Sequence, residues 1–199
     1  MFILYQTMLI VYSILIALFG YISGSIPFGK IIGLRNGIDI QNTGSGNIGF
    51  ANAVRVLGWR AGIYVLIGDV LKGFIPVYIV SNLHNTSQLL ILAVGAAAIL
   101  GHVYPVWLQF KGGKGIATGL GVILAINLSL ALVGILIYAI AFSIFRKSAP
   151  SSLTATWVVS FASVMMNQKY SWFYIALGFV ALWTHRQNIR SLMIRPAIE

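Results

Sequence analysis

Long apolar runs restrict what this chain can fold into more than any other feature. Hydrophobic residues make up 59% of its 199 positions and charged residues only 8%, against roughly 25% charged residues in ordinary soluble domains. Runs of about 20 apolar residues are long enough to cross a bilayer as helices. We therefore expect an all-α integral membrane protein in which residues 1–199 form a single domain.

Three membrane spans follow directly from the apolar runs. We predict them over residues 2–22, 61–80 and 89–110. The basic stretch after the first span is expected in the cytoplasm, because Lys and Arg gather in cytoplasmic loops. Its basic residues are Lys30, Arg35, Arg55 and Arg60. The link at 81–88 contains neither Lys nor Arg and is expected outside.

Residues 116–145 form about thirty largely apolar positions, which is long for a single crossing. One crossing would leave the basic pair at 146–147 outside the cell. Two short helices that turn near Asn127 keep this pair and the basic C-terminus inside. With two later runs at 151–166 and 170–184, we predict about seven helices, some half-length. The N-terminus is then outside and the C-terminus cytoplasmic.

The charge of the chain is one-sided, with 13 Lys and Arg against three acids and a net charge of +10. Because the basic residues stand beside the spans, we interpret them as anchors to anionic lipid headgroups and not as a nucleic-acid surface. Membrane lipids are expected partners, whereas nucleic acid and an obligate protein partner are not. The lack of cysteine excludes disulfides and thiolate nucleophiles, and three histidines with three acids favour neither a metal nor another cofactor.

The first of three polar stretches is Gly44-Ser45-Gly46-Asn47-Ile48-Gly49, which matches the pattern G-x-G-x-x-G. A dinucleotide fingerprint needs a preceding strand, and the acid that would bind the ribose, Asp69, lies inside a predicted span. What remains is a glycine turn before a helix that starts near residues 48–51, with N–H groups directed at an anion and Arg55 clamping the same oxygens. The alternative is a simple helix cap with Ser45 or Asn47 as the capping residue.

The second stretch is Lys111-Gly112-Gly113-Lys114-Gly115. It is not a Walker loop, because Gly115 stands where a Ser or Thr would hold magnesium. Two lysines around a glycine pair still predict a positive nest for phosphate, to which Thr118 adds a hydroxyl one helical turn beyond Lys114. The alternative is a basic turn that anchors the chain at the membrane edge.

The third stretch contains His185 and Asn188, which are three residues apart and so share one face of a helix. Both can then reach one substrate hydroxyl or phosphate. The alternative for His185 is an ordinary hydrogen-bonding role at the membrane interface. For His102 we favour this ordinary role. Asp69 and Lys72 lie inside a span, and we interpret them as a structural ion pair, with a functional role as the alternative.

Together these stretches resemble one family closely, the bacterial acyl-phosphate:glycerol-3-phosphate acyltransferases, membrane enzymes of the PlsY type. The resemblance runs from about residue 20 to 195, in the family's order and spacing. Its motifs are Gly24-Ser25-Ile26-Pro27-Phe28-Gly29, the stretch Gly44–Gly49 with Asn52 and Arg55, Asp69-Val70-Leu71-Lys72-Gly73, Gly101-His102 with Pro105, Phe110 to Thr118, and His185-Arg186 with Asn188-Ile189.

The chain also departs from the family pattern in two places. It has Phe50-Ala51 where the family usually has Ala-Thr, so a threonine hydroxyl is missing. Near the C-terminus, Ser191, Arg195 and Ala197 stand where the family usually has arginine, glycine and glutamate.

The resemblance implies transfer of a fatty acyl group from acyl phosphate to the 1-hydroxyl of sn-glycerol 3-phosphate. The implied products are lysophosphatidic acid and phosphate, at the first acylation of phospholipid biosynthesis. Acyl phosphate, and neither acyl-CoA nor acyl carrier protein, is the implied donor. The implied location is the inner (plasma) membrane of a bacterium, with the active site at the cytoplasmic face.

The resemblance and the residue chemistry together assign roles. The expected catalytic residues are Ser45, Arg55, Lys114, His185 and Asn188, and the expected substrate-binding residues are Gly44, Gly46, Asn47, Asn52, Lys111, Gly112, Gly113 and Thr118. One phosphate is expected at Ser45, Gly46, Asn47 and Arg55. Glycerol 3-phosphate and the developing oxyanion are expected at the loop Lys111–Lys114, with His185 and Asn188 orienting the attacking hydroxyl. The hydroxyl proton goes to His185 or to a phosphate oxygen of the donor, and the scarcity of carboxylates favours the phosphate. A covalent acyl-Ser45 ranks last, because no activating base neighbours that serine.

The rival interpretation is a carrier for organic phosphates with a basic cavity. Carriers place their sites near the bilayer midplane and are often built from repeated halves. This chain shows no repeat, and its motifs stand at one predicted membrane face, so the enzyme is favoured.

Overall fold

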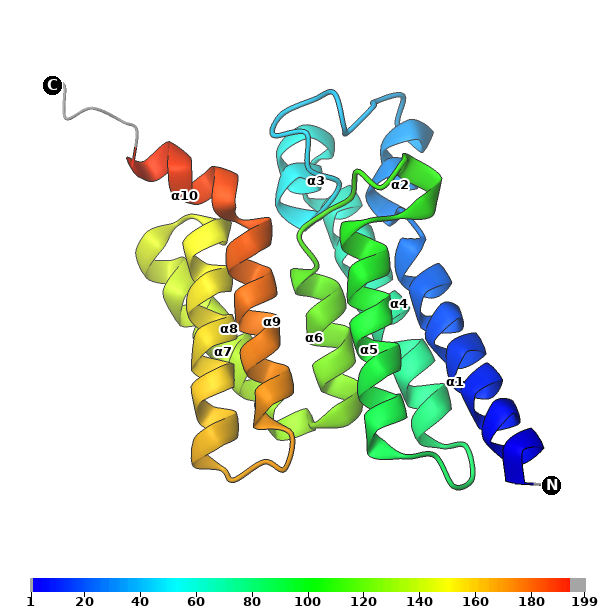
Figure 1. Ribbon diagram of the computed structural model, residues 1–199. Coiled ribbons are helices and arrows are strands. Elements are labelled where there is room, and N and C mark those ends of the chain that lie inside the picture. Colours follow the sequence, from blue (N-terminus) through cyan, green and yellow to red (C-terminus); the bar gives the residue numbers. More distant parts are fainter. Residues whose placement is uncertain (1, 194–199) are drawn as a thin grey trace, which may run out of the picture. The chain divides into compact units, whose positions relative to one another are not determined.

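The computed structural model describes residues 2–193, and this part of the chain is built from helices (Figure 1). The chain forms two compact units that divide between Ile126 and Asn127. The first unit holds α1 (Phe2–Ser25), α2 (Phe28–Arg35), α3 (Phe50–Leu57), α4 (Trp59–Ser81), α5 (Gln88–Val103), the short 3-10 helix η1 (Val106–Leu108) and α6 (Ile116–Ile126). The second unit holds α7 (Leu128–Phe145), α8 (Ser148–Met165), α9 (Ser171–Thr184) and α10 (Arg186–Met193). The single domain over residues 1–199 stays a prediction.

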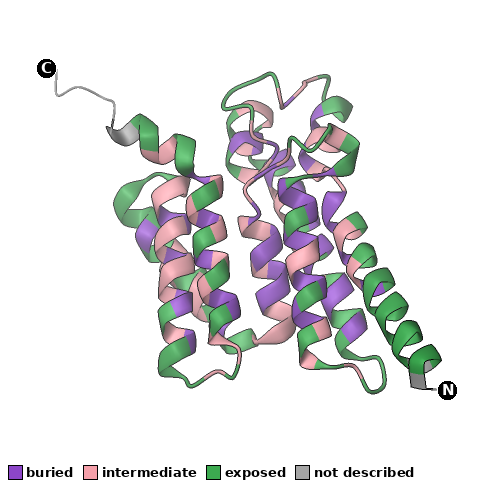
Figure 2. Cartoon of the chain, in the orientation of Figure 1, coloured by how far each residue is buried: buried purple, intermediate pink, exposed green. Residues whose placement is uncertain are grey.

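Four of the described stretches are long and apolar enough to cross a membrane. They are Gln6–Arg35, Trp59–Ser81, Gln88–Leu108 and Leu128–Phe145, and α6 and α9 are shorter apolar helices. Figure 2 shows exposed positions along much of α1, where the outward side chains are nevertheless large and apolar, as Met8 is at 72% exposure. Such a surface suits lipid and not water. The all-α integral membrane fold is confirmed, while the number of seven helices and their orientation stay predictions.

Close backbone contact joins α1 to α5 inside the first unit. A Cβ atom at Gly24 would lie 1.9 Å from the carbonyl oxygen of Ala98, and one at Gly101 would lie 2.2 Å from that of Tyr21. Small residues allow this approach, which is the usual source of helix association in lipid, because burial of apolar surface gives no advantage there. The hydroxyl of Tyr21 also donates a 2.7 Å hydrogen bond to the carbonyl of Tyr104, just past the end of α5.

The predicted break in the long apolar run lies at Asn127. This residue has an extended backbone (φ −152°, ψ 97°), and its side-chain oxygen accepts from the N–H of Leu130 and so caps α7. Its amide donates a 3.0 Å bond to the Oε1 atom of Gln168, in the link between α8 and α9. The division of residues 116–145 into two helices near Asn127 is confirmed, but only α6 is short, since α7 is long enough to cross a membrane. The reversal of direction between them stays a prediction.

The second unit is held partly by side chains that reach the backbone of the neighbouring helix. Ser160 of α8 donates a 2.7 Å bond to the carbonyl of Tyr174 in α9, and Ser171 donates a 3.0 Å bond to the carbonyl of Ser163. Such bonds are available in lipid, where no water competes for these groups. They fix α9, whose last turn leads into His185.

Candidate active site

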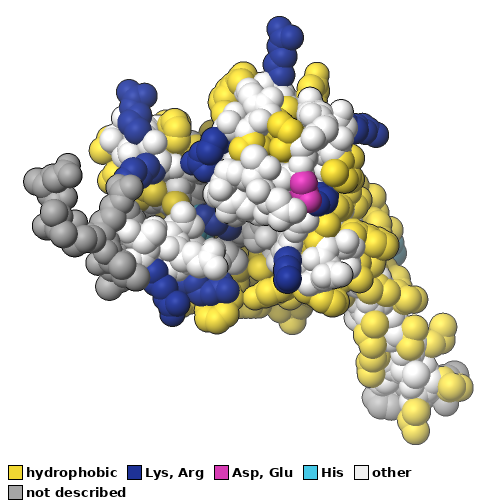
Figure 3. Space-filling view, turned by 90° about the horizontal axis from the view of Figure 1, so that it is seen from above, with side chains coloured by type: hydrophobic (Ala, Val, Ile, Leu, Met, Phe, Trp, Pro, Cys, Tyr) yellow, Lys and Arg dark blue, Asp and Glu magenta, His cyan; other side chains and the backbone are white. Residues whose placement is uncertain are grey.

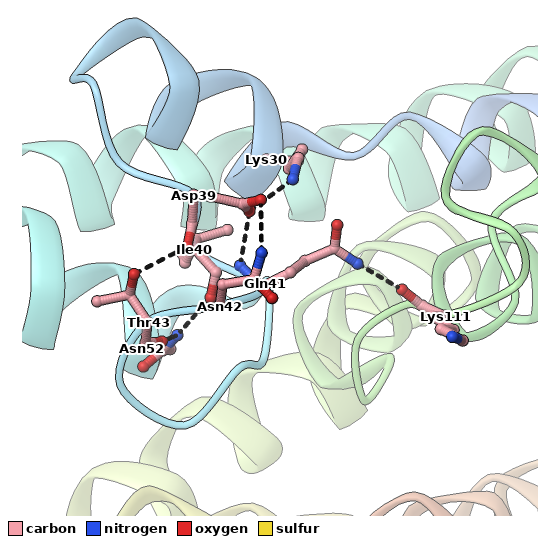
Figure 4. A network of polar contacts seen from close by, with 8 residues as sticks. All are labelled: Lys30, Asp39, Ile40, Gln41, Asn42, Thr43, Asn52 and Lys111. Carbon is pink, nitrogen blue, oxygen red and sulfur yellow. Dashed lines mark hydrogen bonds and ion pairs between the residues drawn. The ribbon is translucent and has the colours of Figure 1, made fainter.

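Asn52 builds the loop that contains the first motif (Figure 4). Its side chain is buried, and its amide donates to the carbonyls of Ile40 at 3.2 Å and Thr43 at 3.0 Å. Its oxygen accepts a 2.9 Å bond from the N–H of Ser45. Both amide hydrogens of Asn52 are therefore used inside the loop, which differs from the direct substrate contact that we expected.

Asp39 fixes the start of the same loop. Its carboxylate pairs with Lys30 of α2 and accepts hydrogen bonds from the N–H of Gln41 at 3.1 Å and from the amide of Asn42 at 3.0 Å. The hydrogen bond from Lys30 lowers the pKa of Asp39 below its ordinary value, so the carboxylate is ionised at neutral pH. Sequence reasoning missed this role, because a single acid in a loop is no local signal of the contacts that it makes.

The backbone N–H groups of this loop are largely occupied by its own atoms. Besides the N–H of Ser45, that of Gly46 donates to the carbonyl of Thr43 at 3.2 Å and that of Gly49 to the Oδ1 atom of Asn47 at 2.9 Å. These three N–H groups are therefore not available to an anion, and the expectation that the first N–H groups of the following helix face one stays a prediction. Gly44 has a positive φ of 67°, and a Cβ atom there would lie 2.4 Å from the Oδ1 atom of Asn52. The glycine therefore serves the turn and its close packing.

The helix after the first motif begins at Phe50, inside the predicted window of residues 48–51. Gly49 precedes it and no side chain caps it, so the alternative in which Ser45 or Asn47 caps the helix is wrong. Ser45 and Arg55 are both exposed, so their side chains are accessible to a ligand. That these two side chains bind an anion stays a prediction.

The glycine pair of the second motif lies against the end of α5. The N–H of Gly112 donates to the carbonyl of Val103 at 3.1 Å, and that of Gly113 to the carbonyl of His102 at 3.0 Å. These bonds satisfy the last carbonyls of α5, which a helix leaves without partners of its own. These two N–H groups are therefore not available to the expected phosphate nest, and phosphate binding by the lysine side chains stays a prediction.

The two lysines of the second motif differ in environment. Lys111 is exposed, whereas Lys114 is partly buried, and this burial lowers the pKa of the Lys114 ammonium. Gln41 of the first loop donates a 3.1 Å bond to the carbonyl of Lys111 (Figure 4). The two motif loops, far apart in sequence, are thus joined at one end of the first unit. Figure 3 looks onto the molecule from the top of Figure 1 and shows, among the described side chains in view, several Lys and Arg and an acidic group at one place only.

A buried polar cluster lies among α4, α5 and α6. The Nζ atom of Lys72 lies 2.9 Å from the Oδ1 atom of Asp69, and the two side chains form an ion pair without a well-aligned hydrogen bond. The ammonium of Lys72 donates its hydrogen bond to the carbonyl of Ile26 at 2.8 Å. The predicted Asp69–Lys72 pair is confirmed. The Nδ1 atom of His102 lies 3.0 Å from the hydroxyl of Thr118 and 3.6 Å from Asp69. Thr118 was expected to face the substrate, but it is fully buried and bonded to His102.

The third motif lies in the second unit. His185 ends α9 and is buried, and its Nδ1 atom lies 2.8 Å from the carbonyl oxygen of Ala181. A carbonyl can only accept, so Nδ1 holds the proton and Nε2 is the acceptor nitrogen of the neutral ring. Asn188 follows in the first turn of α10, partly buried. Arg195 and Ala197 lie outside the described residues.

No group of three or more His, Cys, Asp and Glu that could hold a metal ion occurs within residues 2–193.

Comparison with known proteins decides the family. The family model described as glycerol-3-phosphate acyltransferase matches residues 14–195. This chain belongs to the glycerol-3-phosphate acyltransferase family. The glycerol-3-phosphate acyltransferase of Myxococcus xanthus (strain DK1622) is 43% identical over 184 residues, which cover 90% of this chain and 95% of that protein. The one from Aquifex aeolicus (strain VF5) is 37% identical over 183 residues, covering 91% and 95%.

A solved member of the glycerol-3-phosphate acyltransferase family also shares this fold. The crystal structure of PlsY (YgiH), an integral membrane glycerol 3-phosphate acyltransferase, in its glycerol 3-phosphate form has a TM-score of 0.87 and 36% identity, and the match covers 92% of each chain. Its lysophosphatidic acid form has a TM-score of 0.85. The resemblance to the PlsY type is thus confirmed, and with it a multi-pass membrane protein.

Proposed function

We propose that this protein transfers a fatty acyl group from acyl phosphate to the 1-hydroxyl of sn-glycerol 3-phosphate. Membership of the glycerol-3-phosphate acyltransferase family supports this proposal most strongly. The solved PlsY structures are described with glycerol 3-phosphate and with lysophosphatidic acid, the acceptor and the acylated product of this reaction. We place the reaction at the cytoplasmic face of a bacterial inner membrane.

The reaction needs little covalent chemistry from the protein. The hydroxyl oxygen of glycerol 3-phosphate attacks the acyl carbonyl carbon, a new C–O bond forms, and the C–O bond to the phosphate breaks. Because acyl phosphate is a mixed anhydride with a good leaving group, positioning and charge stabilisation suffice. The cations of the two joined loops support this part of the proposal, since both substrates are anionic.

We assign the roles as follows. Ser45 and Arg55 bind one phosphate through their side chains. Lys111 and Lys114 bind glycerol 3-phosphate, and Lys114 also stabilises the developing oxyanion. Gly44, Gly46, Asn47 and Asn52 act by shaping the first loop, and Gly112 and Gly113 by placing Lys114. His185 and Asn188 orient the attacking hydroxyl.

The proton of that hydroxyl passes to a phosphate oxygen of the donor. The neutral His185 ring, with its proton on Nδ1, has an acceptor Nε2 and so provides the alternative base. Replacing His185 by Ala separates the two routes. A loss of several thousandfold in turnover with normal substrate binding would contradict the substrate-assisted route.

The decisive experiment measures acyl transfer by the purified, detergent-solubilised protein. Labelled glycerol 3-phosphate is offered with palmitoyl phosphate, palmitoyl-CoA or palmitoyl carrier protein, without added metal. We expect lysophosphatidic acid from palmitoyl phosphate alone, and at least a hundredfold lower turnover in Ser45→Ala and Lys114→Ala, the size seen when one group that stabilises a transition state is removed.

Lys169→Ala is the matched control, because this exposed lysine lies in the link between α8 and α9, outside the three motifs. Its activity should equal that of the parent protein. Equal product from palmitoyl-CoA would overturn the donor assignment. No product from any donor, with folded protein that still binds glycerol 3-phosphate, would support the carrier instead.

A further inference from the structure

His102 lies between the buried charges of the first unit and the loop that ends in Lys114. Its side chain is only 3% exposed. On one side, its Nδ1 atom lies 3.0 Å from the hydroxyl of Thr118 and 3.6 Å from the Oδ1 atom of Asp69. On the other side, its Nε2 atom faces Gly113, where an added Cβ atom would lie only 2.1 Å away. The ring therefore leaves no space for a side chain at Gly113.

His102 and Gly113 also contact each other through their main chains. The N–H of Gly113 donates a 3.0 Å bond to the carbonyl of His102. Lys114 follows directly, and Gly115, with a positive φ of 80°, turns the chain into α6. One turn into α6, Thr118 returns to the ring of His102. The segment 102–118 thus begins at His102 and contacts it again at Gly113 and at Thr118, with Lys114 between these two contacts.

The cluster beneath the ring resists displacement. Asp69 and Lys72 have side-chain exposures of 2% and 1%, and separating a buried pair of charges leaves each of them without compensation in a medium of low dielectric constant. Lys72 is held in turn by its bond to the carbonyl of Ile26, and Ser23 donates a 3.0 Å bond to the carbonyl of Lys72. The His102 ring therefore rests on a support that joins α1, α4 and α5.

We propose that His102, oriented by Thr118 and the Asp69–Lys72 pair, is a positioning residue that sets where the Lys114 ammonium lies. This inference rests on the proposed function in one respect, namely that Lys114 contacts the substrate. Thr118 then acts through the ring of His102, and not by touching the substrate as its place in the motif predicts. The glycine pair is required because any side chain there would displace the ring or the loop.

The test uses Thr118→Val, which keeps the volume of the side chain and removes the hydroxyl. We expect kcat/KM for glycerol 3-phosphate to fall about fivefold to tenfold, the effect of one lost hydrogen bond. The fall should appear mainly in KM for glycerol 3-phosphate, while KM for acyl phosphate stays within about twofold. Thr118→Ser, which restores a hydroxyl, should recover most of the loss. Thr156→Val is the matched control, because the hydroxyl of Thr156 bonds only within α8, to Ser152.

A second readout does not depend on activity. In the protein without substrate, an amine-reactive reagent followed by peptide mass spectrometry gives the labelling rate of Lys114 relative to Lys111, which is exposed and serves as the internal reference. We expect this ratio to rise at least threefold in Thr118→Val and in His102→Asn. Combining the two substitutions should raise it no further, because both act on one ring.

The outcomes separate the possible explanations. A loss of glycerol 3-phosphate affinity in Thr118→Val with an unchanged Lys114:Lys111 ratio would mean direct substrate contact and would overturn the proposal. Equal losses for both substrates with a lower melting temperature would reduce the cluster to a structural role and overturn it as well. If the parent protein transfers no acyl group at all, the proposed function fails, but the labelling ratio still supports or refutes the positioning of Lys114.

Discussion

Lys114 combines two properties that oppose each other. The proposed binding of glycerol 3-phosphate needs its positive charge, while partial burial lowers its pKa below that of an ordinary lysine. The charge is present below that lowered pKa and is lost as the pH rises through it. We therefore expect KM for glycerol 3-phosphate to rise with increasing pH, and to begin rising at a lower pH than it would with an ordinary lysine.

Lys114→Arg should remove this alkaline rise, because a guanidinium keeps its charge throughout the accessible range, although the different shape lowers turnover at neutral pH. The measurement is KM for glycerol 3-phosphate from pH 6 to 10 for both proteins. Lys111→Arg is the matched control and should leave the profile of the parent unchanged. An alkaline rise that persists in Lys114→Arg would assign the titration to another group.

At the scale of elements, the loop before α3 depends on one side chain. Asn52→Ala removes the acceptor for the N–H of Ser45 and two donors to loop carbonyls. Leaving such groups without partners costs roughly 1–3 kcal/mol each where they are buried. We expect the amides of residues 40–47 to exchange hydrogen at least tenfold faster, and acyl transfer to fall by a similar factor.

Hydrogen exchange followed by mass spectrometry checks this expectation, with α7–α9 as the region that should not change. Asn36→Ala is the control, since the amide of Asn36 makes one exposed bond, to the carbonyl of Ile32 at the end of α2. If the loop keeps its protection in Asn52→Ala while activity is lost, Asn52 contacts the substrate directly, as the sequence predicts.

For the molecule as a whole, the predicted topology places the link at 81–88 outside the cell and residue 147 in the cytoplasm. The chain contains no cysteine, so single cysteines can report the side of the membrane without interference. We expect a membrane-impermeant maleimide to label His84→Cys in intact cells, and Lys147→Cys only after the membrane is permeabilised. Labelling of Lys147→Cys in intact cells would mean that residues 116–145 cross once, and the predicted reversal at Asn127 would be wrong.

The all-helical membrane fold, the break at Asn127 and the motifs of the family were predictable from the order of the residues alone. Runs of apolar residues and a single capping asparagine are local signals, because a bilayer leaves the backbone of a spanning segment no partners except its own. The candidate site residues Ser45, Lys114 and His185 were found from another local signal. They lie in stretches rich in glycine and basic residues, which stand out in an otherwise apolar chain.

The contacts of the individual polar atoms could not be predicted from the sequence, because they depend on how the helices and loops pack. Gln41 meets Lys111 across seventy residues, and Thr118 meets His102 across sixteen, so no local pattern encodes either pair. In lipid, the buried and the outward faces of a helix are both apolar, so periodicity does not indicate which face carries Thr118 inward. Close contacts between backbones, as at Gly73 and Gly24, make that choice, and they exist only once the helices are packed.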